Sequence, residues 1–244
     1  MKQLFSETSD AVLNLIFPIY CQGCGVKLSY DNKRYLCEGC FKNIKLKSPP
    51  LCIKCGKSVS GDKESKSLCA ECLNRNYHFA AAWQCCEYEG LIKELIHKFK
   101  YNGKLLLKGV LGEILCGFAK SRIDYKRVDA IVAVPMHRAN FVKRGFNQAA
   151  ILSEILSKSL DIPFLDKCLS KIKNTKQQVS LNRNERSLNI RDAFCVKKGA
   201  DIKGKRLLLV DDVFTTGATV DECSKVLNAQ GAKAVWVLVL ARGI

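Results

Sequence analysis

Apolar residues recur with two different periods from about residue 79 to the end of the chain. Apolar runs at 79–88, 128–135, 205–210 and 234–241 predict β-strands. Apolar positions at helical spacing predict helices at 90–101, 105–123, 147–160 and 218–231. Strands that alternate with helices indicate right-handed crossovers and a mostly parallel sheet covered on both faces. Ligands of such sheets bind at the carboxyl ends of the strands.

The first 78 residues lack this alternation, and we expect two domains, 1–78 and 79–244. A short amphipathic helix is expected near the start, with an apolar face made of Leu4, Phe5, Val12, Leu15 and Ile16. Acidic residues interrupt this stretch, so it does not resemble a secretory signal. No apolar run reaches the ~18 residues of a membrane span. We therefore expect a cytoplasmic protein without a membrane span.

Eight of the 14 cysteines form four CxxC pairs in this first part. The pairs are Cys21/Cys24, Cys37/Cys40, Cys52/Cys55 and Cys69/Cys72. Two such turns together provide the four thiolates of a tetrahedral Zn²⁺ site. Disulfides would need an oxidising compartment, and a redox CxxC normally occurs once in a chain. We expect two structural zinc sites, with sequential pairing preferred and interleaved pairing left open.

The charge of the chain is unusual. It has 40 Lys and Arg residues but only 23 Asp and Glu residues, which gives a formal net charge of +17. Such an excess suits a polyanionic partner, which could be nucleic acid, a phosphorylated ligand or an anionic membrane surface. A basic, solvated surface without a specific partner is the alternative explanation.

A loop near the C-terminus, "DDVFTTGAT", follows the predicted strand at 205–210 and precedes a predicted helix. Backbone N–H groups around Thr215 to Thr219 can converge on one anion at the start of that helix, and Gly217 allows a close approach. The two carboxylates before the loop, Asp211 and Asp212, suit the hydroxyl groups of a sugar. The ligand implied is a phosphorylated ribose.

Two further loops are expected at the same edge of the sheet. The first, "MHRANFVKRGFNQ", contains Arg138, Lys143 and Arg144. The second, residues 170–192, is long and polar, and a loop of this length is typical of a functional lid or a disordered segment. The lid and nucleic-acid candidates in these two loops are Lys143, Arg144, Lys173, Lys176, Gln178, Arg183 and Arg186.

The stretch "VDDVFTTGAT" resembles the PRPP-binding motif of type I phosphoribosyltransferases. Together with "YEGLIKELIHKFKYNGK", "VPMHRANFVKRGFNQAAILSEIL" and the cysteine pairs, it makes nearly the whole chain similar to the ComF family of competence proteins. The resemblance implies an α/β fold, in which a type I phosphoribosyltransferase-like parallel sheet follows an N-terminal Cys₄ zinc-ribbon domain. It also implies a role in natural transformation, on imported single-stranded DNA.

The same resemblance implies that PRPP binds together with Mg²⁺. The PRPP-binding residues would be Asp211, Asp212, Thr215, Thr216, Gly217, Ala218, Thr219 and Arg138. Among them the aspartates would contact the ribose diol, the Thr215–Thr219 loop the 5′-phosphate, and Arg138 the pyrophosphate. Purine-salvage relatives carry an acidic residue where this chain has Thr215, so the general acid or base of that chemistry is absent.

Three functions therefore stay open at this point. The first is a DNA-handling competence protein with a phosphoribose pocket, and the +17 charge favours it. The second is an active phosphoribosyltransferase on an unidentified acceptor. The third is a non-catalytic adaptor whose zinc ribbons bind a DNA-uptake or recombination protein.

Overall fold

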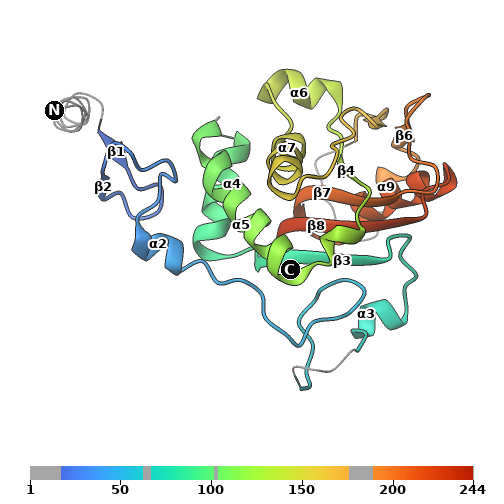
Figure 1. The fold of residues 1–244 in the computed structure, drawn as a ribbon, viewed down its shortest axis with the longest axis horizontal. Coiled ribbons are helices and arrows are strands. Elements are labelled where there is room, and N and C mark those ends of the chain that lie inside the picture. Colours follow the sequence, from blue (N-terminus) through green and yellow to red (C-terminus); the bar gives the residue numbers. More distant parts are fainter. Residues whose placement is uncertain (1–17, 63–66, 102–103, 176–188, 244) are drawn as a thin grey trace.

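The computed structural model describes residues 18–62, 67–101, 104–175 and 189–243 (Figure 1). The helix expected near the N-terminus lies outside these ranges. Residues 176–188 of the polar loop expected at 170–192 also lie outside them. Within the described ranges, none of the helices combines the length and the apolar character needed to cross a membrane.

A four-stranded sheet forms the centre of the molecule (Figure 1). Its strands, in spatial order, are β3 (Ala81–Glu87), β8 (Ala234–Arg242), β7 (Arg206–Phe214) and β4 (Ala130–Ala133). Every neighbouring pair is parallel, which confirms the predicted fold class. The long strands β7 and β8 lie in the middle, and β8 continues beside β7 as far as Phe214. The shorter β4 ends opposite Val210, so residues 211–214 of β7 extend beyond the β4 pairing at the carboxyl edge.

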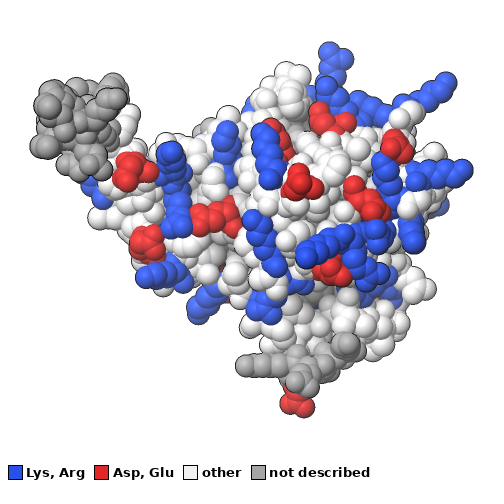
Figure 2. All heavy atoms as spheres, viewed as in Figure 1, with Lys and Arg blue, Asp and Glu red and all other residues white. Residues whose placement is uncertain are grey.

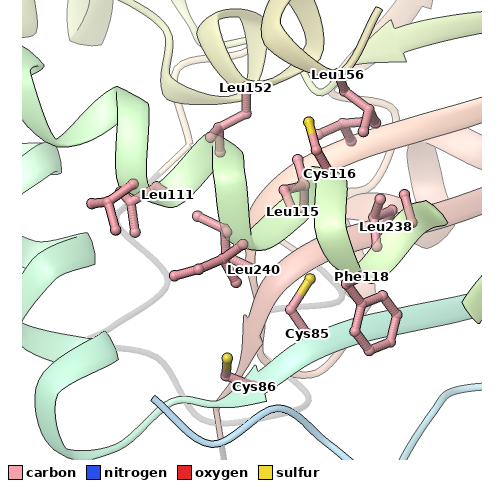
Figure 3. Packing of buried hydrophobic residues seen from close by; sticks show 14 of the residues in the cluster. Cys85, Cys86, Leu111, Leu115, Cys116, Phe118, Leu152, Leu156, Leu238 and Leu240 are labelled. Carbon is pink, nitrogen blue, oxygen red and sulfur yellow. The ribbon is translucent and has the colours of Figure 1, made fainter. Parts of the chain in front are cut away.

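Three helices cover one face of the sheet: α4 (Gly90–Tyr101), α5 (Lys108–Arg122) and α7 (Gln148–Leu160). Side chains alternate between the faces of a strand, so Leu208 and Val210 of β7 join this core while Leu207 and Leu209 face away from it. Figure 3 shows this core, in which buried side chains of α5, α7, β3 and β8 pack together. The labelled side chains are Cys85, Cys86, Leu111, Leu115, Cys116, Phe118, Leu152, Leu156, Leu238 and Leu240. The three cysteines among them are buried.

The opposite face is covered by α9 (Ala218–Ala229) and by a short antiparallel pair, β5 (Leu169–Lys171) with β6 (Phe194–Val196). Their apolar residues form a second core with Leu207 and Leu209 of β7. The cysteines at 52, 55, 69 and 72 belong to the same buried cluster. One of the two cysteine-rich segments therefore packs directly on the central sheet.

The segments that hold the CxxC pairs contain little regular structure. The first ribbon, residues 18–44, contains the antiparallel strands β1 (Ile19–Tyr20) and β2 (Lys27–Leu28) and the helix α2 (Glu38–Lys42). Its Arg34 donates two hydrogen bonds of 2.7 Å to Glu113 of α5. The second ribbon, residues 50–74, ends in the helix α3 (Ala70–Leu73). Figure 1 shows the two ribbons at separate places along the edge of the sheet domain.

Several boundaries differ from those predicted from the sequence. The strand expected at 205–210 continues to Phe214 and includes both aspartates, because β8 offers pairing partners up to Arg242. The segment after β4, expected as a loop, contains the helix α6 (Arg138–Arg144). The His137 ring caps it by accepting a 3.2 Å hydrogen bond from the Ala139 N–H, and Gly145 ends it in the left-handed conformation. Two 3₁₀ turns complete the fold, η1 (Leu105–Leu107) and η2 (Tyr125–Arg127).

Candidate functional site

The structure gathers the eight CxxC cysteines into two clusters, one in each ribbon. The first holds Cys21, Cys24, Cys37 and Cys40, and the second holds Cys52, Cys55, Cys69 and Cys72, with all sulfur atoms of a cluster within 4.8 Å of one another. Sequential pairing is therefore confirmed. Zinc–sulfur bonds of about 2.3 Å place tetrahedral ligands about 3.8 Å apart. The Cys24–Cys37 and Cys55–Cys69 sulfur distances of 3.7 and 3.6 Å match this spacing, so each cluster fits one zinc ion.

The two aspartates lie at the carboxyl end of β7, the strand in the middle of the sheet. The Asp212 side chain is 9% exposed, and its carboxylate lies 2.8 Å from the Nζ atom of Lys100 on α4. The Asp211 carboxylate accepts a 2.9 Å hydrogen bond from the Asp212 N–H. Adjacent side chains leave opposite faces of a strand, so the two carboxylates have different surroundings.

The charges around the aspartates are unequal. Burial raises the pKa of Asp211 to about 7, and the neighbouring Asp212 carboxylate adds to the rise. Burial lowers the pKa of Lys171 on β5, although Asp211 opposes this shift. Burial also disfavours the charged form of Lys100, but Asp212 outweighs it and raises the pKa of that amine. Asp212 therefore already has a cationic partner in Lys100. Asp211 has none of this kind within its own strand, and a ligand that brings a positive charge or a hydroxyl donor would stabilise its charged form.

The loop after β7 brings together Thr215, Thr216, Gly217, Ala218 and Thr219 at the start of α9. Gly217 is the N-cap of this 12-residue helix and has the left-handed conformation, with a φ of 75°. Glycine provides no side chain that could form a capping hydrogen bond to the first N–H groups of the helix. A methyl group at Gly217 would lie 2.5 Å from the ring of Phe214, so the turn is held tightly against β7. The first N–H groups of a helix lack partners within the helix and favour anions. The geometry suits a phosphate at this turn.

The second ribbon is connected to this turn through Arg242 and Phe214. The Arg242 guanidinium donates a 3.0 Å hydrogen bond to the carbonyl of the zinc-cluster residue Cys55. The same guanidinium lies 4.8 Å from the centre of the Phe214 ring, which contacts Gly217. Phe79 packs edge-on against Phe214, with ring centres 6.2 Å apart. A chain of contacts therefore joins the second cysteine cluster to the turn.

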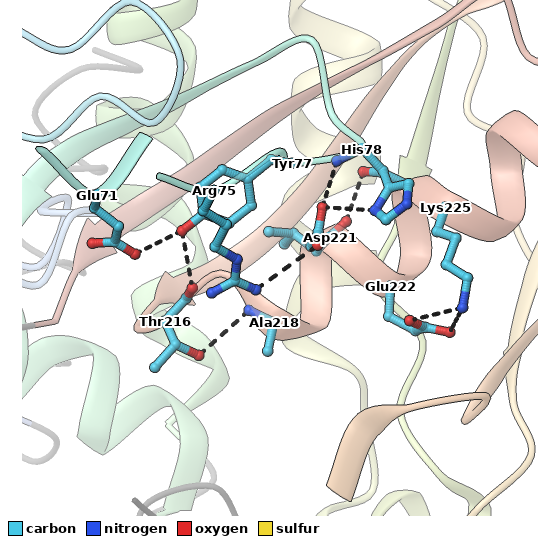
Figure 4. A network of polar contacts seen from close by, with 11 residues as sticks. Glu71, Arg75, Tyr77, His78, Thr216, Ala218, Asp221, Glu222 and Lys225 are labelled. Carbon is cyan, nitrogen blue, oxygen red and sulfur yellow. Dashed lines mark hydrogen bonds and ion pairs between the residues drawn. The ribbon is translucent and has the colours of Figure 1, made fainter. Parts of the chain in front are cut away.

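A polar network continues this support along α9 (Figure 4). The Tyr77 hydroxyl donates a 2.7 Å hydrogen bond to Glu71 of α3 and lies 3.5 Å from the Thr216 carbonyl. Asp221, in the first turn of α9, accepts a 2.6 Å hydrogen bond from the His78 N–H and lies 3.9 Å from Arg75. Figure 4 shows Asp221 between His78 and Arg75, so this carboxylate already has two partners.

The basic candidates take different positions. Arg138 and Lys143 lie exposed on α6, and the half-buried Arg144 donates a 2.9 Å hydrogen bond to Gln148 of α7. Lys173 is exposed just after β5 and donates to the Arg191 carbonyl at 3.1 Å. The remaining candidates, Lys176, Gln178, Arg183 and Arg186, lie outside the described residues.

Sequence reasoning missed the residues that connect distant parts of the site. Lys100 lies in the helix predicted at 90–101 and Lys171 in the polar loop at 170–192, and the sequence singles out neither of them. Arg242 and Tyr77 carried no motif at all. The one available signal was an arginine at the end of an otherwise apolar strand, since a buried cation there needs partners.

Comparison with known proteins matches both parts of the chain. A family model described as a double zinc ribbon domain covers residues 12–73, and one described as a phosphoribosyl transferase domain covers residues 142–244. Orotate phosphoribosyltransferase from Aeropyrum pernix aligns with 58% of this chain and 63% of its own, at 21% identity and a TM-score of 0.36, which is too low for comparing sites.

Several curated relatives match over nearly the whole length. The chain is 34% identical to competence protein F from Haemophilus influenzae, over 86% of this chain and 91% of that protein. It is 27% identical to the DNA utilization protein YhgH from Escherichia coli, over 93% and 99%. Competence protein ComFC from Streptococcus pneumoniae is 29% identical, over 84% and 86%. The chain therefore belongs to the competence protein F family and joins a double zinc ribbon to a phosphoribosyl transferase domain.

Proposed function

We propose that this protein acts in the cytoplasm on imported single-stranded DNA, and that its sheet domain binds PRPP or a similar phosphorylated ribose together with Mg²⁺. The observation that carries the pocket is the junction of β7 and α9, where four residues separate a carboxylate pair from a left-handed glycine at a helix N-terminus. The names of the relatives and the +17 charge support the link to DNA.

Within this pocket the 5′-phosphate would bind the backbone N–H groups of Thr215 to Thr219. Asp211 would accept hydrogen bonds from the ribose hydroxyls. Asp212 would do so as well if its 2.8 Å pair with Lys100 loosens on binding, and Lys100 would then be free to approach the pyrophosphate. Arg138, exposed on α6, would approach the pyrophosphate from the β4 side.

Hard oxygen donors are the ligands that Mg²⁺ prefers, and the Asp211 carboxylate and the PRPP oxygens are of this type. The ion would neutralise the charge of the pyrophosphate. The two zinc ions would have a structural role, because four thiolates leave no open position for a catalytic water. We place the boundary between the domains at residues 78 and 79, after α3 and before β3.

Titration of the wild type and of an Asp211→Asn/Asp212→Asn variant with PRPP and Mg²⁺ tests the pocket. Isothermal calorimetry should detect binding by the wild type and at least a tenfold loss in the variant, because each lost carboxylate removes charge-assisted hydrogen bonds. Single-stranded DNA binding, measured in parallel, should weaken steeply with salt. Absence of PRPP binding by the folded wild type would refute the pocket, and absence of salt-sensitive DNA binding would refute the DNA role.

Release of pyrophosphate from PRPP in the presence of a panel of acceptors separates an enzyme from a binding protein. An active phosphoribosyltransferase would release pyrophosphate in an acceptor-dependent manner. Binding of PRPP without release above background would favour a sensor or adaptor role for the same pocket.

A further inference from the structure

The carboxyl end of α4 and the neighbouring helix α6 expose aromatic side chains that no part of the phosphoribose pocket requires. Tyr101, the last residue of α4, is 50% exposed, and Phe141 on α6 is 47% exposed. Val142, next to Phe141, is 75% exposed. Large apolar groups at such exposure are informative when they gather beside a functional site.

Contacts of the Tyr101 ring with His97 and Arg144, together with the helical spacing of Phe141, connect these side chains into one strip. The His97 and Tyr101 rings lie one helical turn apart on α4, with ring centres 4.8 Å apart. The Arg144 guanidinium lies 5.1 Å from the centre of the Tyr101 ring and so joins α6 to α4. Phe141 is three residues before Arg144, so it occupies the same side of α6. We call these four residues the α4–α6 strip.

The strip is basic as well as aromatic. Helix α6 reads RANFVKR and contains three cations and no carboxylate, with Arg138 and Lys143 exposed. Glu94, the acidic residue on this side of α4, lies two turns before Tyr101, which is about 10 Å along the helix axis. Figure 2 shows Lys and Arg side chains outnumbering acidic ones over this face of the molecule.

The strip also begins next to the pocket. Lys100, the residue before Tyr101, forms the ion pair with Asp212 at the end of β7. A ligand on the strip therefore lies directly beside the carboxyl edge of the sheet. Half of the Tyr101 surface is still exposed although His97 and Arg144 contact the ring.

We propose that single-stranded nucleic acid binds across the α4–α6 strip, with bases stacked on Tyr101 and Phe141 and phosphates facing Arg138, Lys143 and Arg144. This inference rests on the proposed DNA role and names the surface that carries it. Flat rings interleaved with cations match the alternation of bases and phosphates along a single strand. Charge complementarity favours this occupant over a protein. Helix α6 contains no acidic residue that would repel the phosphates of a polyanion.

Fluorescence anisotropy with a labelled deoxythymidine oligonucleotide of about 20 nucleotides tests the surface, because such a strand cannot pair with itself. Tyr101→Ala and Phe141→Ala should each weaken binding about tenfold, and Tyr101→Phe should bind like the wild type, because stacking needs the ring and not the hydroxyl. Lys143→Gln should instead reduce the slope of log affinity against log salt by about 0.7, the value for one phosphate contact on a single strand.

The matched control is Tyr20→Ala, which removes a tyrosine of similar exposure, 49%, from the first ribbon. Thermal melting and PRPP titration of Phe141→Ala report whether that variant keeps its fold and pocket, and both should be unchanged. If the wild type binds the oligonucleotide but the two alanine variants bind like Tyr20→Ala, the strip is not the surface, while the DNA role stands. If the wild type does not bind the oligonucleotide even at low salt, both proposals fall.

Discussion

At the scale of single residues, the candidate site depends on a glycine that no other residue can replace. Gly217 has a φ of 75°, and a Cβ atom there would lie 2.5 Å from the Phe214 ring. The ring cannot retreat easily, because Phe79 and Arg242 pack against it. Backbone strain and a steric clash therefore coincide where the phosphate is proposed to bind.

We predict that Gly217→Ala destabilises the protein and abolishes PRPP binding. Gly199 is the matched control, because its φ is 83° but its Cβ would meet nothing within 4 Å. Gly199→Ala should cost about 1–2 kcal/mol, the strain of the left-handed conformation. Gly217→Ala should cost about 1–3 kcal/mol more through overpacking. Chemical denaturation and PRPP calorimetry measure both effects, and equal costs for the two variants would contradict the clash.

At the scale of elements, helix α4 is fixed to the end of β7 by the Lys100–Asp212 ion pair. Both side chains are largely buried, at 18% and 9% exposure. A buried pair contributes little net stability, but the removal of one partner leaves an uncompensated charge. The pair therefore holds the helix that carries Tyr101 in place beside the carboxyl edge of the sheet.

We predict that Lys100→Met and Asp212→Asn are strongly non-additive. Lys100→Met should destabilise the protein by about 3 kcal/mol, because it leaves Asp212 buried without a cation. The double variant should be more stable than the sum of the single losses implies, by about 1–3 kcal/mol. Urea denaturation of the four proteins gives this coupling energy, and additive effects would mean that the two groups do not interact in solution.

At the scale of the whole molecule, the two zinc ribbons have unequal relations to the sheet domain. The first ribbon packs on the α4–α5 side, with Arg34 bonded to Glu113. The second belongs to the same core as α9 and reaches the proposed phosphate turn through Arg242 and Tyr77. Loss of zinc at the second ribbon should therefore disturb the pocket.

We predict that Cys52→Ser/Cys55→Ser and Cys21→Ser/Cys24→Ser each release about one of two zinc ions, as measured by metal analysis, because each pair supplies half of a Cys₄ site. Only the variant of the second ribbon should lose most of its PRPP affinity. Circular dichroism checks that the sheet domain of each variant stays folded. Equal PRPP affinity in the two variants would show that the second ribbon does not support the turn.

The sequence by itself determined the local features of this protein. Helical and strand periods depend on neighbours a few residues apart, so α4, α7 and α9 were predictable to within a few residues. Cysteine pairs and the TTG turn are local as well, and their chemistry follows from residue type and spacing. The helix α6 was not predicted, because a histidine cap and a left-handed glycine bound it within a segment that reads as a loop.

Only the tertiary structure decided how these features meet. β7 extends through both aspartates because β8, which is distant in sequence, pairs with it up to Phe214. Lys100 meets Asp212, and Arg242 meets Cys55, across 112 and 187 positions of the chain. Such contacts depend on how the sheet, helices and ribbons pack together, and no periodicity along the chain encodes them. The proposed phosphate turn was therefore predictable from the sequence, while the contacts that support it and the different surroundings of the two carboxylates were not.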